Sequence, residues 1–524
     1  WLQGKMLMNT SKFPEARETL KDAIDRAKEA SSSATEMKAT GTLGVVNREL
    51  GQTEEARECF ERQLDLADAS GDTEEQISAI GNLGRLYLDL SRYDLAREHH
   101  LKQLVLSHET GSFRSEARAH RGLGIAFHDQ SRWDESLEHF SSALDLDRRI
   151  GDRKYEAIDN MNIGNIYNAT KEYSKAEEHY SAALTMAQEI GDTQTEAVSN
   201  GNLGILHIWT HQYDTACGYL ERNIALSRKT GNKADEAWAL SCLGQTLSFL
   251  GNREEAPKHL QDALELFRAV GNRRDEAFTC LWMGEHCGHL GDFEKAKGYY
   301  EKAMSLSEEI DEPRCRGIAY AKLSEVALLM GHLEAAGKYL ASGLKLSRAS
   351  GQKEAEGYLL YFGGRLTRAK ADLPKTCEAF RDALSVLREL GEKKIIAEVA
   401  LALGSALLES GERDEARALF REAEALVKDI SWRSAGSLPS AYLCLTGDRD
   451  PDEIEVIDSM TEPVKAETFL VLWRASGDTA HLEKAKEIID RMEGRLLPEN
   501  RKAFRANNHL ARMLSTIENQ EPHP

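Results

Sequence analysis

The chain has 524 residues, 41 % of them hydrophobic, and its 87 acidic against 67 basic side chains give a formal net charge of −20. So acidic a protein is not expected to bind nucleic acid or an anionic membrane, since both are held through Lys and Arg. No run of 18 or more apolar residues occurs, so no membrane insertion is predicted. The eight cysteines form no close-spaced pair, which indicates reduced thiols and a cytoplasmic protein.

A spacing of 40 residues runs through most of the chain. A glycine marks it, with serine at position 324 in the one remaining slot: Gly4, Gly44, Gly84, Gly124, Gly164, Gly204, Gly244, Gly284, Ser324, Gly364 and Gly404. A fixed period of this length predicts stacked repeats that form one elongated body, in which each unit touches mainly its neighbours.

Residues 72–111 illustrate one repeat. Asp72 is followed three residues later by Glu75, a helix start of the capping-box type. Apolar and small residues then recur at helical spacing to Leu90, the pattern breaks at residues 91–92, and a second amphipathic run ends at Gly111. Each repeat is therefore predicted to be a helix A, a short turn, a helix B and another short turn.

Small residues at fixed positions of both helices predict how the pairs pack. The glycine of helix A and an alanine of helix B, such as Gly84 and Ala96, let the two helices approach closely. An aromatic residue or leucine of helix B, such as Tyr180, fills the groove between them. Pro257 lies inside a helix B and is expected to kink that helix or to delay its start.

The two ends of the chain depart from the period. Trp1 falls at the repeat position of Gly41 and Gly81, in the middle of a helix A, so we expect a fragment whose parent continues upstream. About eleven 40-residue units fill residues 1–430, the first of them truncated. Residues 431–524 are predicted to form diverged, shorter helical repeats and a last helix, about 499–517, that caps the core.

These columns resemble the tetratricopeptide repeat family, with a small residue in helix A, an aromatic residue three positions later (Tyr87, Phe127, Tyr167), and alanine and aromatic residues in helix B. The longer unit is similar to the LGN/Pins-type scaffolds, and residues 496–504 look like the end of the repeat regions of large bacterial signalling proteins. The resemblance implies an all-α, right-handed superhelical solenoid of antiparallel helix pairs.

Signatures of catalysis are missing from this sequence. It contains no phosphate-binding Gly-x-x-x-x-Gly-Lys loop, no His-Glu-x-x-His and no Gly-x-Ser-x-Gly, so no catalytic residue, cofactor or metal site is predicted. Cys280, His286, Cys287 and His289 share one helix but cannot converge on one ion, and they are interpreted as core and surface residues. The histidines at positions 99, 139, 179 and 259 alternate with tyrosines, which favours a packing role.

In the family, helix A lines a concave groove, so the resemblance implies inward positions for polar and aromatic residues of helix A. Amides there can pair with a peptide backbone, and arginines can clamp carboxylates. The predicted partner-binding residues are Asn82, Arg85, Arg118, Arg121, His128, Asn162, Asn165, Asn168, Asn202, Trp209, Gln245, Glu285, Arg365 and Arg368. For Asn82, Asn162 and Asn202 a structural role is equally expected, because they form a repeating column.

Together these features predict a module that binds a protein or peptide partner in its groove, as the sensing or scaffolding part of a larger signalling protein. The alternative is the regulatory arm of an enzyme whose kinase, NTPase or protease module lies outside this chain, covalently linked upstream of it.

Overall fold

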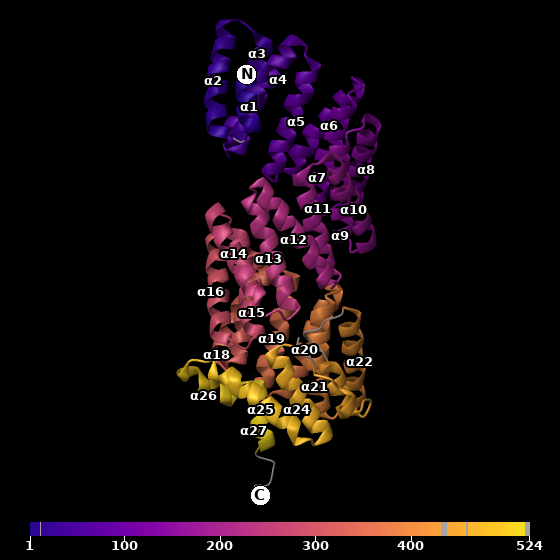
Figure 1. Ribbon diagram of the computed structural model, residues 1–524, viewed down its shortest axis with the longest axis vertical. Coiled ribbons are helices and arrows are strands. Elements are labelled where there is room, and N and C mark those ends of the chain that lie inside the picture. The colour runs from indigo at the N-terminus through magenta and orange to yellow at the C-terminus, as the bar shows by residue number, and fades with distance from the viewer. Residues whose placement is uncertain (11, 431–436, 457–459, 519–524) are drawn as a thin grey trace. The chain divides into compact units, whose positions relative to one another are not determined.

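The computed structural model describes residues 1–10, 12–430, 437–456 and 460–518, and every regular element in this part of the chain is a helix. Two compact units can be distinguished, Trp1–Leu206 and His207–Pro524, and the division falls within helix α11. Within each unit, consecutive helices pack against one another as antiparallel pairs (Figure 1). The predicted all-α architecture of stacked helix pairs is confirmed.

The first unit contains the helices up to the division. They are α1 (Leu2–Asn9), α2 (Phe13–Glu29), α3 (Ser33–Glu49), α4 (Thr53–Ser70), α5 (Thr73–Asp89), α6 (Tyr93–Glu109), α7 (Phe113–Asp129), α8 (Trp133–Ile150), α9 (Arg153–Ala169), α10 (Tyr173–Ile190) and α11 (Thr193–Trp209). Odd-numbered helices are the predicted A helices and also touch one another, as α5 touches α7.

The second unit continues the same alternation and then leaves it. Its regular helices are α12 (Tyr213–Thr230), α13 (Lys233–Phe249), α14 (Glu255–Val270), α15 (Arg273–His289), α16 (Phe293–Glu309), α17 (Pro313–Leu329), α18 (Leu333–Ser350), α19 (Lys353–Ala369), α20 (Leu373–Leu390), α21 (Lys393–Ser410) and α22 (Arg413–Asp429). The remaining elements are α23 (Leu438–Thr446), the 3₁₀ helix η1 (Pro451–Glu453), α24 (Glu462–Ser476), α25 (Thr479–Gly494), α26 (Pro498–Asn507) and α27 (His509–Glu518).

A left-handed residue ends almost every helix of the repeat region. Every twentieth residue from Ser31 to Gly411 has a positive φ, so the turns after helix A and after helix B share one conformation. Glycine occupies most of these positions because it adopts a positive φ without steric cost. Some of the following helices begin with a side-chain cap, and the predicted cap of α5 is present, with the Glu75 amide donating to Asp72 Oδ1 at 3.2 Å.

The glycine of helix A is required by the distance between paired helices. A Cβ atom at Gly164 would lie 2.6 Å from the ring of Tyr180, and one at Gly84 would lie 2.7 Å from the ring of His100. Both separations are shorter than van der Waals contact, so a larger side chain would push helix B away. Ser324 fits the one exceptional slot because its hydroxyl is buried and donates to the Tyr320 carbonyl at 2.7 Å.

Two further predictions about the repeats are confirmed. Helix α14 begins at Glu255, two residues later than the register of its neighbours, and its first amides are capped by Asn252 Oδ1, so Pro257 delays the helix start. The histidines at positions 99, 139 and 179 stack on the aromatic residues of the preceding helix A, with ring centroids 5.2 to 5.5 Å apart, as a packing role requires.

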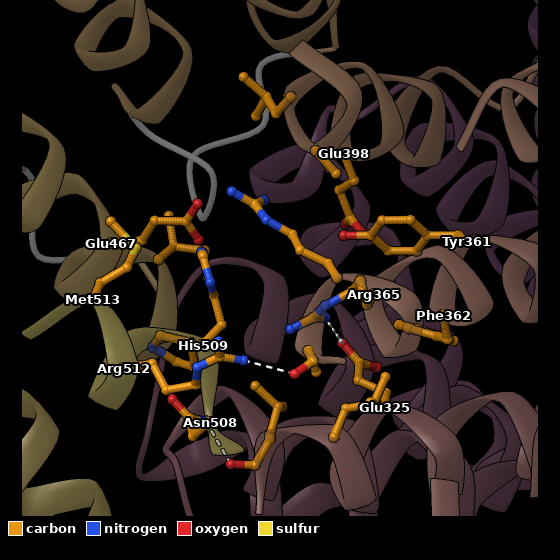
Figure 2. Close-up of a pocket in the computed structure, with 18 of the residues that line it drawn as sticks. Glu325, Tyr361, Phe362, Arg365, Glu398, Glu467, Asn508, His509, Arg512 and Met513 are labelled. Atoms are coloured by element: carbon orange, nitrogen blue, oxygen red, sulfur yellow. Dashed lines mark hydrogen bonds and ion pairs between the residues drawn. The ribbon is translucent and has the colours of Figure 1, made fainter. Parts of the chain in front are cut away.

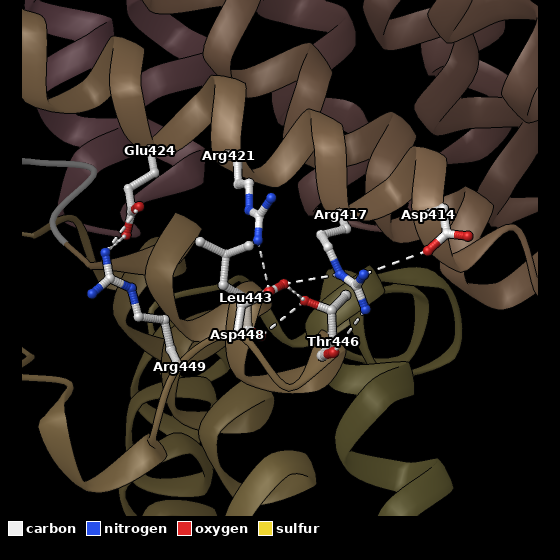
Figure 3. Close-up of polar contacts among 8 residues, drawn as sticks. All are labelled: Asp414, Arg417, Arg421, Glu424, Leu443, Thr446, Asp448 and Arg449. Atoms are coloured by element: carbon white, nitrogen blue, oxygen red, sulfur yellow. Dashed lines mark hydrogen bonds and ion pairs between the residues drawn. The ribbon is translucent and has the colours of Figure 1, made fainter.

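A group of ion pairs joins α22 to the turn after α23 (Figure 3). Asp448 lies between two arginines of α22, with Arg417 Nε 3.0 Å and Arg421 Nη2 2.9 Å from its carboxylate. Its Oδ2 also accepts a hydrogen bond from the Thr446 hydroxyl, and these three partners hold the pKa of Asp448 below its ordinary value. The turn that leads into the C-terminal helices is thereby fixed to the last regular repeat.

The C-terminal helices differ from the expectation at one point. The predicted single helix over 499–517 is two helices, because Asn508 is extended (φ −64°, ψ 135°) and separates α26 from α27. The predicted unit boundary at 430/431 adjoins residues 431–436, which lie outside the described residues, as does the end of the chain after residue 518.

Candidate binding cavity of the second unit

The second unit encloses a cavity of about 770 Å³. One wall consists of helices α15, α17, α19 and α21, here called the inner helices, and the other is formed by α24, α26 and α27. Figure 2 shows Glu325, Tyr361 and Arg365 of the inner helices on one side and Glu467, His509 and Arg512 of the C-terminal helices on the other. The volume is within the range of sites that bind small ligands.

Asn508 holds the C-terminal wall in place. Its side-chain oxygen caps α27 by accepting from the amides of Leu510 and Ala511 at 2.9 and 3.1 Å, and its Nδ2 donates to the Leu329 carbonyl at the end of α17 at 2.5 Å. One buried side chain therefore both starts α27 and attaches it to an inner helix. Asn507 adds a hydrogen bond of 2.8 Å to the Gly331 carbonyl.

Apolar packing supports the same contact. Phe504, Leu510 and Leu514 belong to one hydrophobic cluster with residues of α15, α16 and α17. Phe504 is completely buried. The C-terminal helices therefore share the hydrophobic core of the repeats. Burial of a phenylalanine side chain stabilises the folded state by about 2–3 kcal/mol.

The inner wall carries a buried charge network around Glu285. Lys322 Nζ lies 3.4 Å from both Glu285 and Glu325, and Lys394 Nζ lies 3.9 Å from Glu285. Burial alone would raise the pKa of Glu285, but Lys322 and Lys394 outweigh it and hold that pKa well below the ordinary value. The carboxylate is therefore charged, whereas burial lowers the pKa of His289 to about 4 and keeps that ring neutral at pH 7.

Glu398 on α21 has a different environment. No hydrogen bond or ion pair of its carboxyl group is found among the described residues, and burial together with Glu325 raises its pKa above the ordinary value despite the opposing Lys394. It faces the cavity beside Tyr361 (Figure 2). An unsatisfied carboxyl group on the wall of a cavity is available to a ligand, because its hydrogen-bonding capacity is not used within the protein.

The structure places three of the predicted partner-binding residues on this cavity, namely Glu285, Arg365 and Arg368. Arg365 Nη1 lies 4.0 Å from Glu325, and Arg368 Nη2 donates to the Ser405 hydroxyl at 2.8 Å and contacts Glu409. These side chains are held in position by neighbouring inner helices.

Other predicted residues make contacts between repeats of the first unit. Arg118 Nη2 donates to Asn82 Oδ1 at 2.7 Å, linking α7 to α5. Arg121 Nε donates to the buried Asp159 at 2.7 Å, and its Nη2 contacts the buried Asp147. These three residues hold adjacent A helices together.

Asn165 and Asn168 differ in how their side chains are satisfied. Asn165 accepts a hydrogen bond of 2.8 Å from the Tyr180 hydroxyl, so it packs with helix B of its own repeat. The side-chain oxygen of Asn168 is buried and has no hydrogen-bond partner among the described residues.

The remaining predicted residues lie at or near the surface. Arg85 pairs with Asp89 at 3.3 Å, and the ring of His128 meets Trp133 edge-on at 5.3 Å. Trp209 is 52 % exposed. Asn162, Asn202 and Gln245 are half-buried, and Trp209 and Gln245 do not line the cavity.

Several residues of the cavity were not singled out from the sequence. Glu325 lies at the repeat position shared by Glu285 and Arg365, so including the repeat between these two residues would have found it. Lys322 lies at the repeat position of Asn82, but three repeats after Asn202, the last residue predicted from that column. The residues of the C-terminal wall, such as Glu467, His509 and Arg512, gave no signal, because they follow no repeat register.

The cysteines and histidines of α15 pack against neighbouring residues. Cys280 and Cys287 are buried, as expected of core residues. His286 was expected at the surface but is also buried, and its Nδ1 lies 3.1 Å from the Ser248 hydroxyl. Over the described parts of the chain, no group of three or more His, Cys, Asp or Glu residues is placed to hold a metal ion. No described helix is both long and apolar enough to cross a membrane.

Comparison with known protein families agrees with this geometry. Three sequence models described as tetratricopeptide repeat match residues 35–104, 115–192 and 194–269, residues 279–310, and residues 397–422, together more than half of the chain. The chain belongs to the tetratricopeptide repeat family. No curated protein matches this tetratricopeptide repeat chain in sequence.

Several solved structures are similar to this chain at low sequence identity. A Rap protein complexed with competence and sporulation factor is 15 % identical, with a TM-score of 0.50, covering 68 % of this chain and 99 % of its own. Aspartyl phosphate phosphatase F from Bacillus subtilis is also 15 % identical (TM-score 0.48, covering 66 % and 93 %). A signal transduction ATPase with a tetratricopeptide repeat sensor, from Pyrococcus horikoshii, is 15 % identical (TM-score 0.47, covering 69 % and 55 %).

Proposed function

We propose that this tetratricopeptide repeat chain is a binding module, not an enzyme, and that it captures a segment of a protein partner in the cavity of the second unit. The observation that carries the proposal is the cavity itself, about 770 Å³ in volume and lined by charged and aromatic side chains of the inner helices. Rigid, mutually packed helices with a few polar groups directed inward are the usual construction of a recognition site.

The proposed role is the sensing or scaffolding part of a larger signalling protein that acts in the cytoplasm. The similar Rap structure was determined in complex with competence and sporulation factor, which supports a partner-binding use of such a helical array. The eight cysteines, all with free thiols, suit a reducing compartment.

The inner wall suits a peptide segment because it offers both signs of charge. Glu398 has unused hydrogen-bonding capacity and can accept from backbone amides or from a basic side chain. Arg365 lies over the rings of Tyr361 and Phe362, at about 6 Å from each centroid, and presents a planar donor group beside an apolar surface.

The proposal is tested by filling the cavity. Gly288 lies in α15 on the cavity wall, and a Cβ atom there would meet no other atom within 4 Å. Gly288→Phe should therefore place a ring in the cavity without disturbing the helix, and helix propensity favours the replacement of glycine. Gly298→Phe is the matched control, because Gly298 also lies in a helix with open space around it but does not line the cavity.

The measurement uses a peptide selected on the purified chain from a random-peptide display library. Isothermal titration calorimetry should show affinity weakened about tenfold or more by Gly288→Phe and unchanged by Gly298→Phe, a difference of about 1.4 kcal/mol or more. Equal affinity in the two variants would refute the cavity as the binding site, and failure of every library to yield a binder would count against the function itself.

A further inference from the structure

The C-terminal side of the cavity gathers positive charge. Arg365 and Arg368 of α19, Arg474 of α24 and Arg512 of α27 all line it, and His509 at the start of α27 lies among them. The four arginines all act on the pKa of His509, which burial already lowers well below its ordinary value. Three helices far apart in the sequence therefore bring their cationic groups to one place, in a protein whose net charge is −20.

Part of this charge is not neutralised within the protein. Arg365 and Arg368 have carboxylate partners in Glu325 and Glu409. Arg512 donates to the Ala369 carbonyl at 2.7 Å, a neutral acceptor, and neither Arg512 nor Arg474 has an ion pair with any described residue. A guanidinium group on a cavity wall without a carboxylate partner attracts an anion, and several together can bind one at more than one point.

His509 lies where these charges meet. Burial and all four arginines hold the pKa of its ring well below the ordinary value, so the imidazole is neutral at pH 7. Its Nε2 is buried and has no hydrogen-bond partner among the described residues. The ring therefore neither adds to the charge of the arginines nor compensates for it.

We infer that Arg365, Arg368, Arg474 and Arg512 form an anion subsite of the cavity, which takes a carboxylate or phosphate group of the captured segment. The inference rests on the proposed function and specifies its ligand as acidic. The acidic group enters between α19 and the C-terminal helices, the elements that contribute the four arginines to the cavity lining. The Glu285–Lys322 network on the inner wall is already paired and does not compete for it.

Two small anions test the subsite and distinguish the sources of the acidic group. Tricarballylate presents carboxylates, and pyrophosphate presents phosphates. Binding of each to the full chain is followed by isothermal titration calorimetry at low salt, because screening weakens such contacts. Arg474→Gln removes a charge from an exposed side chain without hydrogen bonds, so folding should be unaffected. Arg365→Gln is a second variant, and Arg381→Gln, an exposed arginine of α20 paired with Glu415, is the control.

At least one anion should bind, with affinity about fivefold or more weaker in Arg474→Gln and Arg365→Gln and unchanged in Arg381→Gln. Stronger binding of tricarballylate would identify a carboxylate, and stronger binding of pyrophosphate a phosphate group. No binding of either anion at about 10 mM, or equal weakening by the control, would overturn the subsite. If the library peptide nevertheless bound in a manner blocked by Gly288→Phe, the subsite would fail while the proposed function stood.

Discussion

The closure of the cavity by the C-terminal helices depends on a backbone contact at Gly331, and replacing this residue by alanine tests it. Gly331 follows α17 with φ +79°, and a Cβ atom there would lie 2.0 Å from the carbonyl oxygen of Ala503 in α26. No rotation of a side chain can relieve this clash, because the obstructing atom belongs to the backbone. Gly331→Ala should therefore displace α26 from the repeats.

The magnitude follows from two contributions. A non-glycine residue with left-handed geometry costs about 1–2 kcal/mol, although Ala371 adopts φ 60° at the equivalent position of the next repeat, so alanine is compatible with the turn. Displacement of α26 also removes the hydrogen bonds from Asn507 to Gly331 and from Asn508 to Leu329. At about 1 kcal/mol each, these bring the expected loss to roughly 3–4 kcal/mol.

Gly411→Ala is the matched control. Gly411 occupies the same position two repeats later, has φ +87° and has no atom within 4 Å of its would-be Cβ. It should lose only the conformational cost of about 1–2 kcal/mol. Urea unfolding followed by circular dichroism compares the variants, and hydrogen exchange over 498–518 reports the displacement directly. Equal destabilisation by the two variants, with unchanged exchange in α26 and α27, would refute the reasoning.

Three further predictions concern buried ionisable groups. His100 is 3 % exposed and burial lowers its pKa to about 4, so the unfolded state takes up a proton as pH falls below 6.5 while the folded state does not. Stability due to the neutral ring is thus present above pH 6.5 and lost towards pH 4. His100→Phe restores the aromatic residue of other repeats and does not titrate, so its free energy of unfolding relative to wild type should rise by about 2 kcal/mol between pH 7 and pH 5, as measured by urea unfolding. A difference between the two proteins that does not change with pH would contradict this prediction. Arg121→Met leaves Asp147 and Asp159 buried without their cation and should cost about 3–5 kcal/mol at pH 7. Burial raises the pKa of Asp159 to about 8, so this carboxyl is already protonated at pH 7, and the cost should fall towards lower pH as Asp147, whose pKa burial also raises, takes up its proton; a loss of partner affinity without loss of stability would instead support a ligand role. Burial raises the pKa of the thiols of Cys242, Cys280 and Cys315, so these cysteines should react with Ellman's reagent at pH 8 only after unfolding, and fast labelling of the native chain would show the repeats to be open.

The repeat region was predictable because every repeat uses the same residue types to pack one helix pair and to form its turns. The glycine of helix A, the aromatic residue of helix B and the left-handed turn recur at fixed spacing, so each prediction rested on the same pattern in many repeats. Even the irregular Pro257 acted as its chemistry requires, by delaying the start of α14. Local rules of this kind do not depend on contacts between distant segments.

The cavity was predictable only in part, because only one of its walls is built from the repeats. Glu285, Arg365 and Arg368, predicted from their positions on helix A, line the cavity. The opposite wall arises from a contact over about 180 residues between Asn508 and Leu329, and no periodicity encodes it. The break at Asn508 was missed because residues 499–517 are helix-forming in composition, whereas the asparagine is used as a cap and an anchor.

Arg121 and Asn165 show the limit of inferring a ligand role from a position on helix A. The inward positions expected for both suggested binding, yet Arg121 forms ion pairs with two buried aspartates and Asn165 accepts from Tyr180. A residue that varies between repeats can compensate for another variation nearby, and Asp147 and Asp159 are such variations. Pairs of this kind are visible only when the helices are placed in space.

The central claim, that a partner segment binds between the inner helices and the C-terminal helices, is tested most directly by the footprint of the bound peptide. Hydrogen–deuterium exchange of the full chain with and without the library peptide should show slower exchange in α19 and α27, whose side chains face each other across the cavity (Figure 2). Protection confined to residues 1–206, with α19 and α27 unchanged, would contradict the account.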